Sequence, residues 1–581
     1  MAKRVIYGES NYATIVRENG HFVDKSGYIP KLETVKNPIF LRPRRFGKSL
    51  FCSMLRYYYD LNYADHFAEL FGQTWIGQHP TPYHNEYIVL FFNFSEIDLG
   101  KHIEKIEHSF KNHGNTILKT LQFEYRNLLA DIPNLNDADS VSDNLGKVLG
   151  YMRGNQLPQV YVIIDEYDNF ANQLITSNQD VLYGELTADG GFLKTFFKTL
   201  KAGRENGSIA NIFITGVLPV TIDELASAFN IGTFLTLEPG FESMLGFTQA
   251  EVDQLLDKIY ADYALDPATR SEVNAIIKSN YNGYHFVDPE GDALYNSTIL
   301  IYFLRYFTVY KEIPEALIDF NLKTDLSWVR RITSGQPGDT EEFVNQLTQE
   351  NRIPYNRDFL ISKFDISQFF EKGFYPISFF YLGLLTKADR FYLRLPNLNL
   401  RQIFVQYFNQ LHHIDVSTRY AEMMQSFVNQ PDLERLFAGY WQEYIGQFPE
   451  AVFQRVNENF YRATFFELCS TYLSPWFTWN MERSYPEGKS DLEFVGKYHE
   501  KFAGMRLVLE FKYISNRRLQ REQIKIDEFK LPTNDTEQIR GYARGLHKEY
   551  PEAQIALFVI YCFGNQGYRI FPVDNNNKSA A

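Results

Sequence analysis

The chain has 581 residues, of which 45% are hydrophobic and 22% are charged, and this composition excludes a disordered or collagen-like protein. Its length predicts about two to four domains. The net charge of -13 excludes an overall basic surface of the kind that non-specific nucleic-acid-binding proteins carry, so a nucleic-acid site would have to be a local basic patch.

The first part of the chain, from about Tyr12 to Pro239, alternates short apolar runs with stretches of helical period. This alternation predicts a parallel sheet flanked by helices. The expected strands are Pro38–Leu41, Tyr87–Phe94, Val160–Ile164, Asn211–Thr215 and Phe234–Leu237.

A mainly helical period follows from about Phe241 to Gln447. Beyond Phe453 the pattern predicts a helix and then strands near Asp491–Val495, Arg506–Tyr513 and Ile555–Cys562, which form a small separate α/β domain. We therefore expect an α/β protein with three parts, at residues 1–240, 241–450 and 451–574.

A phosphate-binding loop is predicted directly after the first strand, where Gly47-Lys48-Ser49 begins a helix. A helix N-terminus offers unpaired N–H groups to a phosphate, Lys48 can reach its oxygens, and Ser49 can bind magnesium. Arg42 stands where such loops usually have glycine, and a chance tripeptide at a helix start is the alternative. The residues expected to bind the nucleotide are Arg42, Arg44, Arg45, Phe46, Gly47, Lys48, Ser49 and Leu50.

Two carboxylates end the buried strand at 160–164, as a nucleotide-hydrolysing site requires. Asp165 would support magnesium and Glu166 would polarise the attacking water. An acidic pair that caps a helix after the strand is the alternative. Thr215 ends a further strand, at the position from which an additional-strand ATPase senses the γ-phosphate, or it caps that strand.

Several segments together resemble the AAA-ATPase-like proteins of bacteria and archaea. They are Phe22–Ser26, Arg42–Ser49, Phe213–Val217, Met244–Thr248, Tyr281–Phe286 and Leu294–Asn296. The resemblance implies an AAA-like P-loop ATPase domain of the additional-strand type, followed by a helical or winged-helix-like middle region. In that family an arginine at the first loop position is normal.

A second group of polar residues lies near the C-terminus. Residues two apart in a strand share a face, so Glu510 and Lys512 point the same way, and hairpin pairing would bring Asp491 to Glu510. The two carboxylates could hold one or two magnesium ions, and Lys512 could orient the attacking water or stabilise developing charge. An exposed hairpin face with an ordinary ion pair is the alternative.

The spacing Asp491…Glu510-x-Lys512 resembles the core of the PD-(D/E)XK nucleases. Gln538 and Tyr542 resemble the helical Q-x-x-x-Y motif of one branch of that superfamily. The resemblance also implies a glutamate upstream as a further metal ligand. Glu458 is preferred over Glu467 for this role, although Arg462 stands where a histidine is often found.

These motifs predict a protein that binds ATP and magnesium, hydrolyses ATP and cleaves nucleic acid, DNA more than RNA. A nucleotide-dependent interaction switch with a non-catalytic nuclease fold, and a nucleotide-binding scaffold in which Lys48 is idle, are the alternatives. Basic residues that could contact phosphates are Arg517, Arg518, Arg521, Lys525 and Lys530, or they form a solvated face. A homo-oligomer is left open.

Three dispersed cysteines exclude a disulfide framework and a cysteine-based zinc site. No apolar run of the kind found in a signal peptide follows the first residues, and none reaches the roughly 20 residues that span a bilayer. We therefore expect a cytoplasmic protein without a membrane partner.

Overall fold

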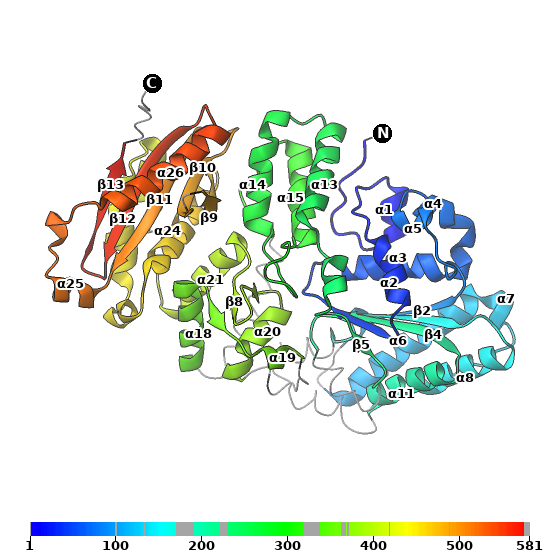
Figure 1. Cartoon of the computed structure of the whole chain (residues 1–581). Coiled ribbons are helices and arrows are strands. Elements are labelled where there is room, and N and C mark those ends of the chain that lie inside the picture. The colour runs from blue at the N-terminus through cyan, green and yellow to red at the C-terminus, as the bar shows by residue number, and fades with distance from the viewer. Residues whose placement is uncertain are drawn as a thin grey trace.

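A computed structural model describes residues 2–98, 102–132, 134–169, 191–219, 230–318, 337–361, 368, 371–416, 419–486 and 488–574. Two α/β parts lie at the two ends of the molecule, and helices of the middle part stand between them (Figure 1). Within the described ranges, no helix is both long and apolar enough to cross a membrane.

The N-terminal part is built on a five-stranded, all-parallel sheet of order β2-β3-β4-β1-β5. Its strands are β1 (Pro38–Leu41), β2 (Ile88–Asn93), β3 (Val160–Asp165), β4 (Ile209–Gly216) and β5 (Thr233–Phe234). β4 is inserted between the strand before the phosphate loop and the strand that ends in Asp165. This arrangement confirms the predicted parallel, additional-strand sheet.

Helices cover both faces of this sheet, as the buried strands of a parallel sheet require (Figure 1). One face carries α3 (Lys48–Tyr59), and the other carries α6 (Ile103–Glu124), α8 (Val141–Gly154) and α11 (Phe192–Glu205). The shorter helices among the described residues of this part are α1 (Tyr12–Arg17), α2 (Ile29–Glu33), α4 (Phe67–Phe71), α5 (Trp75–Gln78) and α7 (Arg126–Leu129).

The middle part is helical, as predicted, and also contains a small antiparallel sheet of order β6-β8-β7. Its helices are α13 (Gln249–Asp262), α14 (Arg270–Tyr281), α15 (Ser297–Tyr310), α18 (Pro337–Glu350), α19 (Arg357–Ile361), α20 (Tyr375–Tyr381), α21 (Leu398–Leu411), α22 (Ala421–Asn429) and α23 (Leu433–Gly439). Its strands are β6 (Ile353–Pro354), β7 (Thr386–Lys387) and β8 (Tyr392–Arg394).

The C-terminal part is a five-stranded mixed sheet of order β13-β12-β11-β10-β9. Its strands are β9 (Phe477–Tyr485), β10 (Gly488–Gly496), β11 (Met505–Ile514), β12 (Gln554–Phe563) and β13 (Gly567–Val573). Its helices are α24 (Glu458–Leu473), α25 (Asn516–Glu522) and α26 (Thr533–Glu549). β11 and β12 are parallel and the other neighbours are antiparallel.

The expected strands of this part appear with slightly extended ends, but the sequence reading missed β9 and β13. β13 contains Pro572, which argues against a strand in sequence. The strand tolerates it because β13 is at the edge of the sheet, where one row of N–H groups needs no partner. The predicted borders between the three parts remain predictions.

One turn ties the helical middle together beside the phosphate loop. Asn397, the N-cap of α21, donates its side-chain N–H to the carbonyl oxygen of Asn282 at 3.2 Å. Gly283 follows with a φ of +107°, and a Cβ placed there would lie 2.0 Å from the carbonyl oxygen of Pro396. Only glycine therefore fits both the backbone conformation and the space.

We expect Gly283→Ala to destabilise the fold by about 3 kcal/mol, because the new methyl group meets rigid backbone. Gly207→Ala is the matched control, since Gly207 also has a positive φ of +80° but open space around it. It should cost only about 1 kcal/mol. Thermal unfolding of both purified variants measures the difference, and equal losses would contradict the assigned close contact.

Candidate functional site

The loop between β1 and α3 turns through two left-handed residues, Arg45 at φ +71° and Gly47 at φ +90°. Lys48 then begins α3, and its ammonium group returns to the loop to donate to the carbonyl oxygens of Arg42 and Pro43, both at 3.0 Å. Burial lowers the pKa of Lys48, while the charges of Glu166 and Asp165 act in the opposite direction. An ammonium has three donors, so one remains for an anionic ligand.

Arg42, predicted to bind the nucleotide, does not line the cavity beside the loop. Its guanidinium group is buried and donates to the carbonyl oxygens of Leu41, Thr236 and Glu242 at 2.9–3.1 Å. It also lies 4.3 Å from the ring centroids of Phe40 and Phe286. The side chain therefore shapes the loop from behind, because all these contacts are inside the protein.

Two of the predicted magnesium-site residues do come together. Burial raises the pKa of Asp165 to about 6, while the nearby Ser49 acts in the opposite direction. One carboxylate oxygen of Asp165 accepts from the backbone N–H of Glu166 at 3.0 Å, and the other is buried without a hydrogen-bond partner. Glu166 has a φ of +52° and lines the cavity beside the loop. This geometry suits a hydrated cation between Ser49 and Asp165.

Thr215 is placed differently from its expected role as a phosphate sensor. Its hydroxyl donates to the carbonyl oxygen of Phe40 at 2.8 Å inside the sheet, and the side chain is buried. Asp168 accepts from the N–H groups of Val217 and Leu218 and so holds the segment that follows β4. The observed contact agrees with the alternative reading of Thr215 as a residue that completes the strand end.

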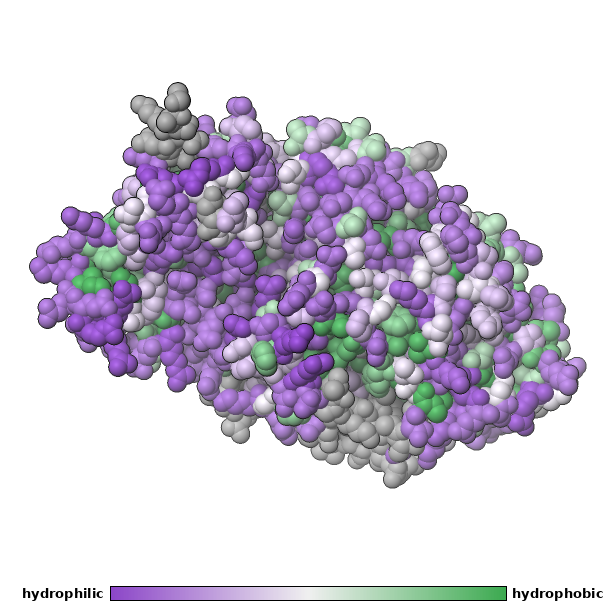
Figure 2. All heavy atoms as spheres, viewed as in Figure 1, coloured by the Kyte–Doolittle hydropathy of each residue, from purple (hydrophilic) through white to green (hydrophobic). Residues whose placement is uncertain are grey.

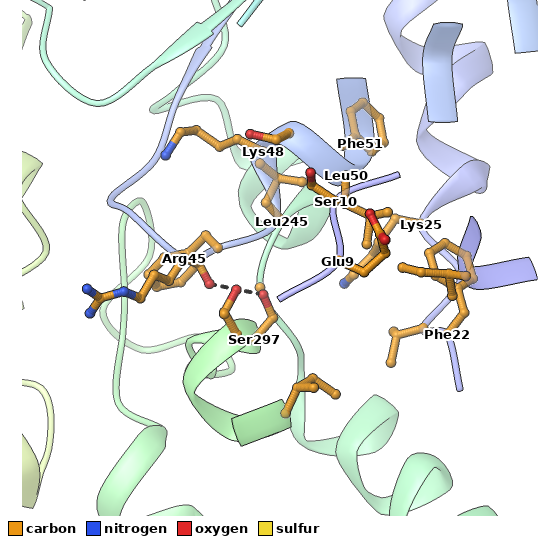
Figure 3. A pocket seen from close by; sticks show the side chains of 18 of the residues that line it. Glu9, Ser10, Phe22, Lys25, Arg45, Lys48, Leu50, Phe51, Leu245 and Ser297 are labelled. Atoms are coloured by element: carbon orange, nitrogen blue, oxygen red, sulfur yellow. Dashed lines mark hydrogen bonds between the residues drawn. The ribbon is translucent and has the colours of Figure 1, made fainter. Parts of the chain in front are cut away.

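A cavity of about 390 Å³ opens beside the loop, within the size range of small-molecule sites. Arg44, Arg45, Phe46, Gly47, Lys48, Ser49 and Leu50 all line it, with Glu166. Figure 3 shows the cationic ends of Lys48 and Arg45 on one side, and Glu9, Ser10 and Phe22 on the other. The N-terminal segment at residues 6–10 and helix α15 also line the cavity, and the sequence pattern did not predict this.

The middle part holds the loop by its backbone. Gly246 N–H donates to the carbonyl oxygen of Phe46 at 3.1 Å, and Thr298 N–H donates to that of Arg45 at 3.0 Å. The Ser297 hydroxyl also donates to the Arg45 oxygen, at 3.2 Å (Figure 3). Three loop carbonyls are paired in this way, since the Asn296 side chain donates to the Arg44 oxygen at 3.3 Å.

The second site lies on the face of the C-terminal sheet that packs on α26. Val508 and Tyr542 belong to the hydrophobic cluster on that face, and Glu510 and Lys512 continue the even positions of β11. Lys512 donates to Glu510 at 2.9 Å. The two predicted carboxylates, Asp491 and Glu510, lie on the neighbouring strands β10 and β11. The Phe511 N–H of β11 donates to Asp491 at 2.7 Å and so holds this carboxylate beside β11.

Gln538 and Tyr542 project from α26 into the same cluster, four residues apart as predicted. Gln538 donates to the Oε1 atom of Glu510 at 3.0 Å and accepts from Lys512 at 3.3 Å. It also donates to the Tyr542 hydroxyl at 2.5 Å, and that hydroxyl donates to the carbonyl oxygen of Lys489 at 2.9 Å. The helix therefore fixes the orientation of Glu510 and Lys512.

The charges in this cluster change the protonation of its acids. Burial and the nearby charge of Asp491 raise the pKa of Glu510 to about 7, against the attraction of Lys512. Burial also raises the pKa of Asp491. The Oε2 atom of Glu510 is buried and has no hydrogen-bond partner. An orphaned carboxylate oxygen between acids with raised pKa values fits a site for a divalent cation.

The two upstream glutamates lie in different surroundings. Burial and the charge of Asp491 raise the pKa of Glu458. Glu458 is therefore close enough to the cluster to be affected by its charge. Glu467 is buried elsewhere and accepts a hydrogen bond from the Asn409 side chain at 3.2 Å. Yet Glu458, Asp491 and Glu510 do not form a three-ligand group, and no such group of acids, histidines or cysteines exists among the described residues. Asp491 and Glu510 are therefore the proposed ligands, and Glu458 as a third ligand stays a prediction. Two carboxylates suffice for magnesium, which keeps several of its waters.

Arg462 occupies the space beside Asp491. Its guanidinium donates to Asp491 at 2.8 Å and to Glu482 at 2.9 Å, and Glu482 also accepts from Arg401 of α21 at 2.7 Å. The role of Glu482 could not be predicted from the sequence, because the strand that carries it, β9, was not predicted. The alternation of Phe477, Trp479 and Met481 was the available signal for that strand.

The predicted basic segment is largely paired with its own acids. Arg518 and Arg521 contact Glu522 at 3.0 and 2.7 Å, and Lys525 contacts Glu528 at 2.8 Å. In Figure 2 hydrophilic side chains surround a smaller hydrophobic patch at this end of the molecule, near α25. These exposed pairs are weak and can exchange for phosphate contacts.

We predict a pH-dependent stability that Glu510→Gln abolishes. Because the pKa of Glu510 rises from 4.5 to about 7 in the folded chain, its contribution to stability is complete below pH 4.5 and is lost as the pH rises to about 7. With chelator present, the melting temperature of Glu510→Gln minus that of wild type should grow by about 2–4 °C from pH 4.5 to 8. The exposed Glu549→Gln is the control, and parallel curves for Glu510→Gln and wild type would refute the assignment.

Comparisons with known proteins agree with this geometry. Residues 6–226, which contain the loop, Asp165 and Thr215, match the family model described as predicted AAA-ATPase. Residues 456–571, which contain Asp491, Glu510, Lys512 and Gln538, match that of the PD-(D/E)XK nuclease superfamily. No curated protein matches the chain. The chain therefore joins a region of the predicted AAA-ATPase family to a C-terminal domain of the PD-(D/E)XK nuclease superfamily.

Proposed function

We propose that this protein binds and hydrolyses ATP and carries a metal-dependent phosphodiesterase that cleaves nucleic acid, DNA more than RNA. One observation carries the nuclease proposal: one buried carboxylate oxygen of Glu510 has no hydrogen-bond partner, although the other accepts from both Lys512 and Gln538. A buried acceptor of this kind is costly unless a cation or a water completes it. The proposed place of action is the cytoplasm.

At the nucleotide site, Lys48 has one donor left for a β- or γ-phosphate oxygen, and the N–H groups at the start of α3 face the same ligand. Arg44 and Arg45 line the cavity and add positive charge beside the phosphates. Ser49 and Asp165 would hold the magnesium ion that accompanies ATP. Glu166, which also lines the cavity, would orient and polarise the attacking water.

At the nuclease site, Asp491 and Glu510 would hold a divalent cation, magnesium by the chemistry of the ligands. Such an ion, when bound, activates water and neutralises charge on the phosphodiester. Lys512 is kept protonated against its burial by Glu510, so it can stabilise the negative charge that develops on the phosphate. Gln538 holds both Glu510 and Lys512 in place.

A nucleotide-dependent interaction switch is the second candidate. It is favoured by one observation, the 2.8 Å contact of Arg462 with Asp491. A cation from the chain itself can satisfy this carboxylate without a metal ion. The nuclease fold would then bind nucleic acid or protein without cutting it.

We expect Asp491→Asn and Glu510→Gln each to lower cleavage of DNA by at least about 100-fold, because each removes a metal ligand's charge. Single- and double-stranded DNA and RNA should be tested with Mg²⁺ or Mn²⁺ and ATP. Glu549→Gln removes an exposed acid of the same domain and should cleave like wild type. Unchanged cleavage by the two site variants would rule out this active site, and retained binding without any cleavage by wild type would favour the switch.

We expect Lys48→Ala to weaken ATP binding by about tenfold or more, since a charge-assisted hydrogen bond to phosphate is lost. Calorimetric titration of the full chain measures this affinity, and thermal unfolding reports whether the loop still folds. Lys147→Ala is the matched control, because Lys147 is an ion-paired lysine of α8 outside the cavity. Normal ATP binding by folded Lys48→Ala would mean that the lysine is idle.

A further inference from the structure

A row of alternating charges crosses the C-terminal domain and ends in the helical middle. Arg462 of α24 contacts Asp491 of β10 at 2.8 Å and Glu482 of β9 at 2.9 Å. Glu482 in turn contacts Arg401 of α21 at 2.7 Å. None of the three contacts is required by the proposed cleavage chemistry.

The row is largely out of water. The side chain of Arg462 is 6% exposed and that of Asp491 is 14% exposed. Exposed ion pairs contribute little, but breaking a buried pair leaves an uncompensated charge. Glu482 moreover has a φ of +54°, which non-glycine residues seldom adopt. The position of Glu482 is therefore imposed by its surroundings.

Arg462 and a divalent cation would compete for Asp491. One carboxylate oxygen of Asp491 already accepts from the Phe511 N–H at 2.7 Å, and the other accepts from Arg462. A cation bound to that second oxygen at about 2.1 Å would lie close to the guanidinium and be repelled by it. Metal binding therefore requires Arg462 to loosen its hold on Asp491.

Arg462 can give up this contact without becoming unpaired. Its Nη1 atom holds Asp491, whereas its Nη2 atom holds Glu482 and the side-chain oxygen of Asn459. The planar fork of the guanidinium thus divides between an acid of the proposed metal site and an acid outside it. The second set of partners remains when the first is exchanged for a metal ion.

We propose that Arg462 is an internal competitor of the metal ion, a positioning residue that neutralises Asp491 until a divalent cation displaces it from that carboxylate and leaves it paired with Glu482. This inference rests on the proposed metal-dependent function. With this competition, the affinity of the domain for the metal ion depends on an arginine that contacts no substrate. The metal concentration at which the domain becomes active then depends on the same arginine.

Binding of Mn²⁺ to the full chain without nucleotide tests the proposal, measured by calorimetry and by the loss of the free-ion paramagnetic resonance signal. We expect Arg462→Gln to bind Mn²⁺ about tenfold more tightly than wild type, which corresponds to about 1.4 kcal/mol. The gain should disappear in the double variant Arg462→Gln with Asp491→Asn. A purely structural role of Arg462 would instead weaken binding.

Arg483→Gln is the matched control for a general change in charge, because Arg483 is a partly buried arginine of the same strand as Glu482 that contacts Glu493 and Glu549. It should leave the Mn²⁺ affinity unchanged. Arg462→Lys keeps the charge but cannot hold two acids with one planar fork, so it should show a smaller gain in the same direction. This variant decides the question if thermal unfolding shows that Arg462→Gln does not fold.

The possible failures are distinguishable. Wild-type binding that depends on Asp491, with unchanged or weaker binding by both Arg462 variants, would overturn the competition and leave the metal site intact. Wild-type binding that is absent or insensitive to Asp491→Asn would overturn the metal site and this inference together. An equal gain in Arg483→Gln would overturn the specific role of Arg462.

Discussion

A cation that is taken out of water must be paired, and four such groups determine the geometry of both sites. Arg42 and Lys48 are buried at the nucleotide loop, where backbone carbonyl oxygens accept their N–H groups. Arg462 and Lys512 are paired with carboxylates in the C-terminal domain. A cation paired with neutral carbonyl oxygens keeps its charge and can attract phosphate, whereas a cation paired with a carboxylate has its charge cancelled. The two sites thus start from opposite electrostatic conditions.

This difference agrees with what each site is proposed to bind. The cavity beside the phosphate loop has a positive loop at one side and is proposed to bind a ligand that brings its own negative charge. The C-terminal cluster instead holds acids that burial and mutual repulsion keep protonated more readily, as the raised pKa of Glu510 indicates. A bound positive ion would reduce the repulsion between these carboxylates. The net negative charge of the whole chain is compatible with binding of nucleic acid, because neither the binding of ATP nor the binding of the metal ion depends on the average charge of the surface.

Much of the fold could be predicted because local pattern and tertiary structure agree. β1 and β3 are apolar runs in sequence and inner strands of their sheet in the structure. Lys48, Asp491, Glu510 and Gln538 could be proposed as site residues because fixed spacings place them on one loop, one face or one helix turn. Arg42 and Thr215 show the limit of such spacings, because the direction of each side chain depends on carbonyl groups from distant segments.

The contacts of Arg462 could not be predicted for the same reason. Glu482 and Arg401 are separated by 81 positions in sequence, and only the packing of α21 against the domain brings them together. The walls of the nucleotide cavity likewise come from residues 6–10, from α3 and from α15. Spacing rules describe residues within one element, and these sites are completed between elements.

The backbone pairing of the phosphate loop has a consequence for how such a protein could arise. The carbonyl oxygens of Arg44, Arg45 and Phe46 accept from residues 246 and 296–298, which lie beyond the ATPase-like sheet. A recombination event that joined this sheet to an unrelated middle region would leave three loop acceptors without donors. The first two parts of the chain are therefore expected to be inherited as one unit.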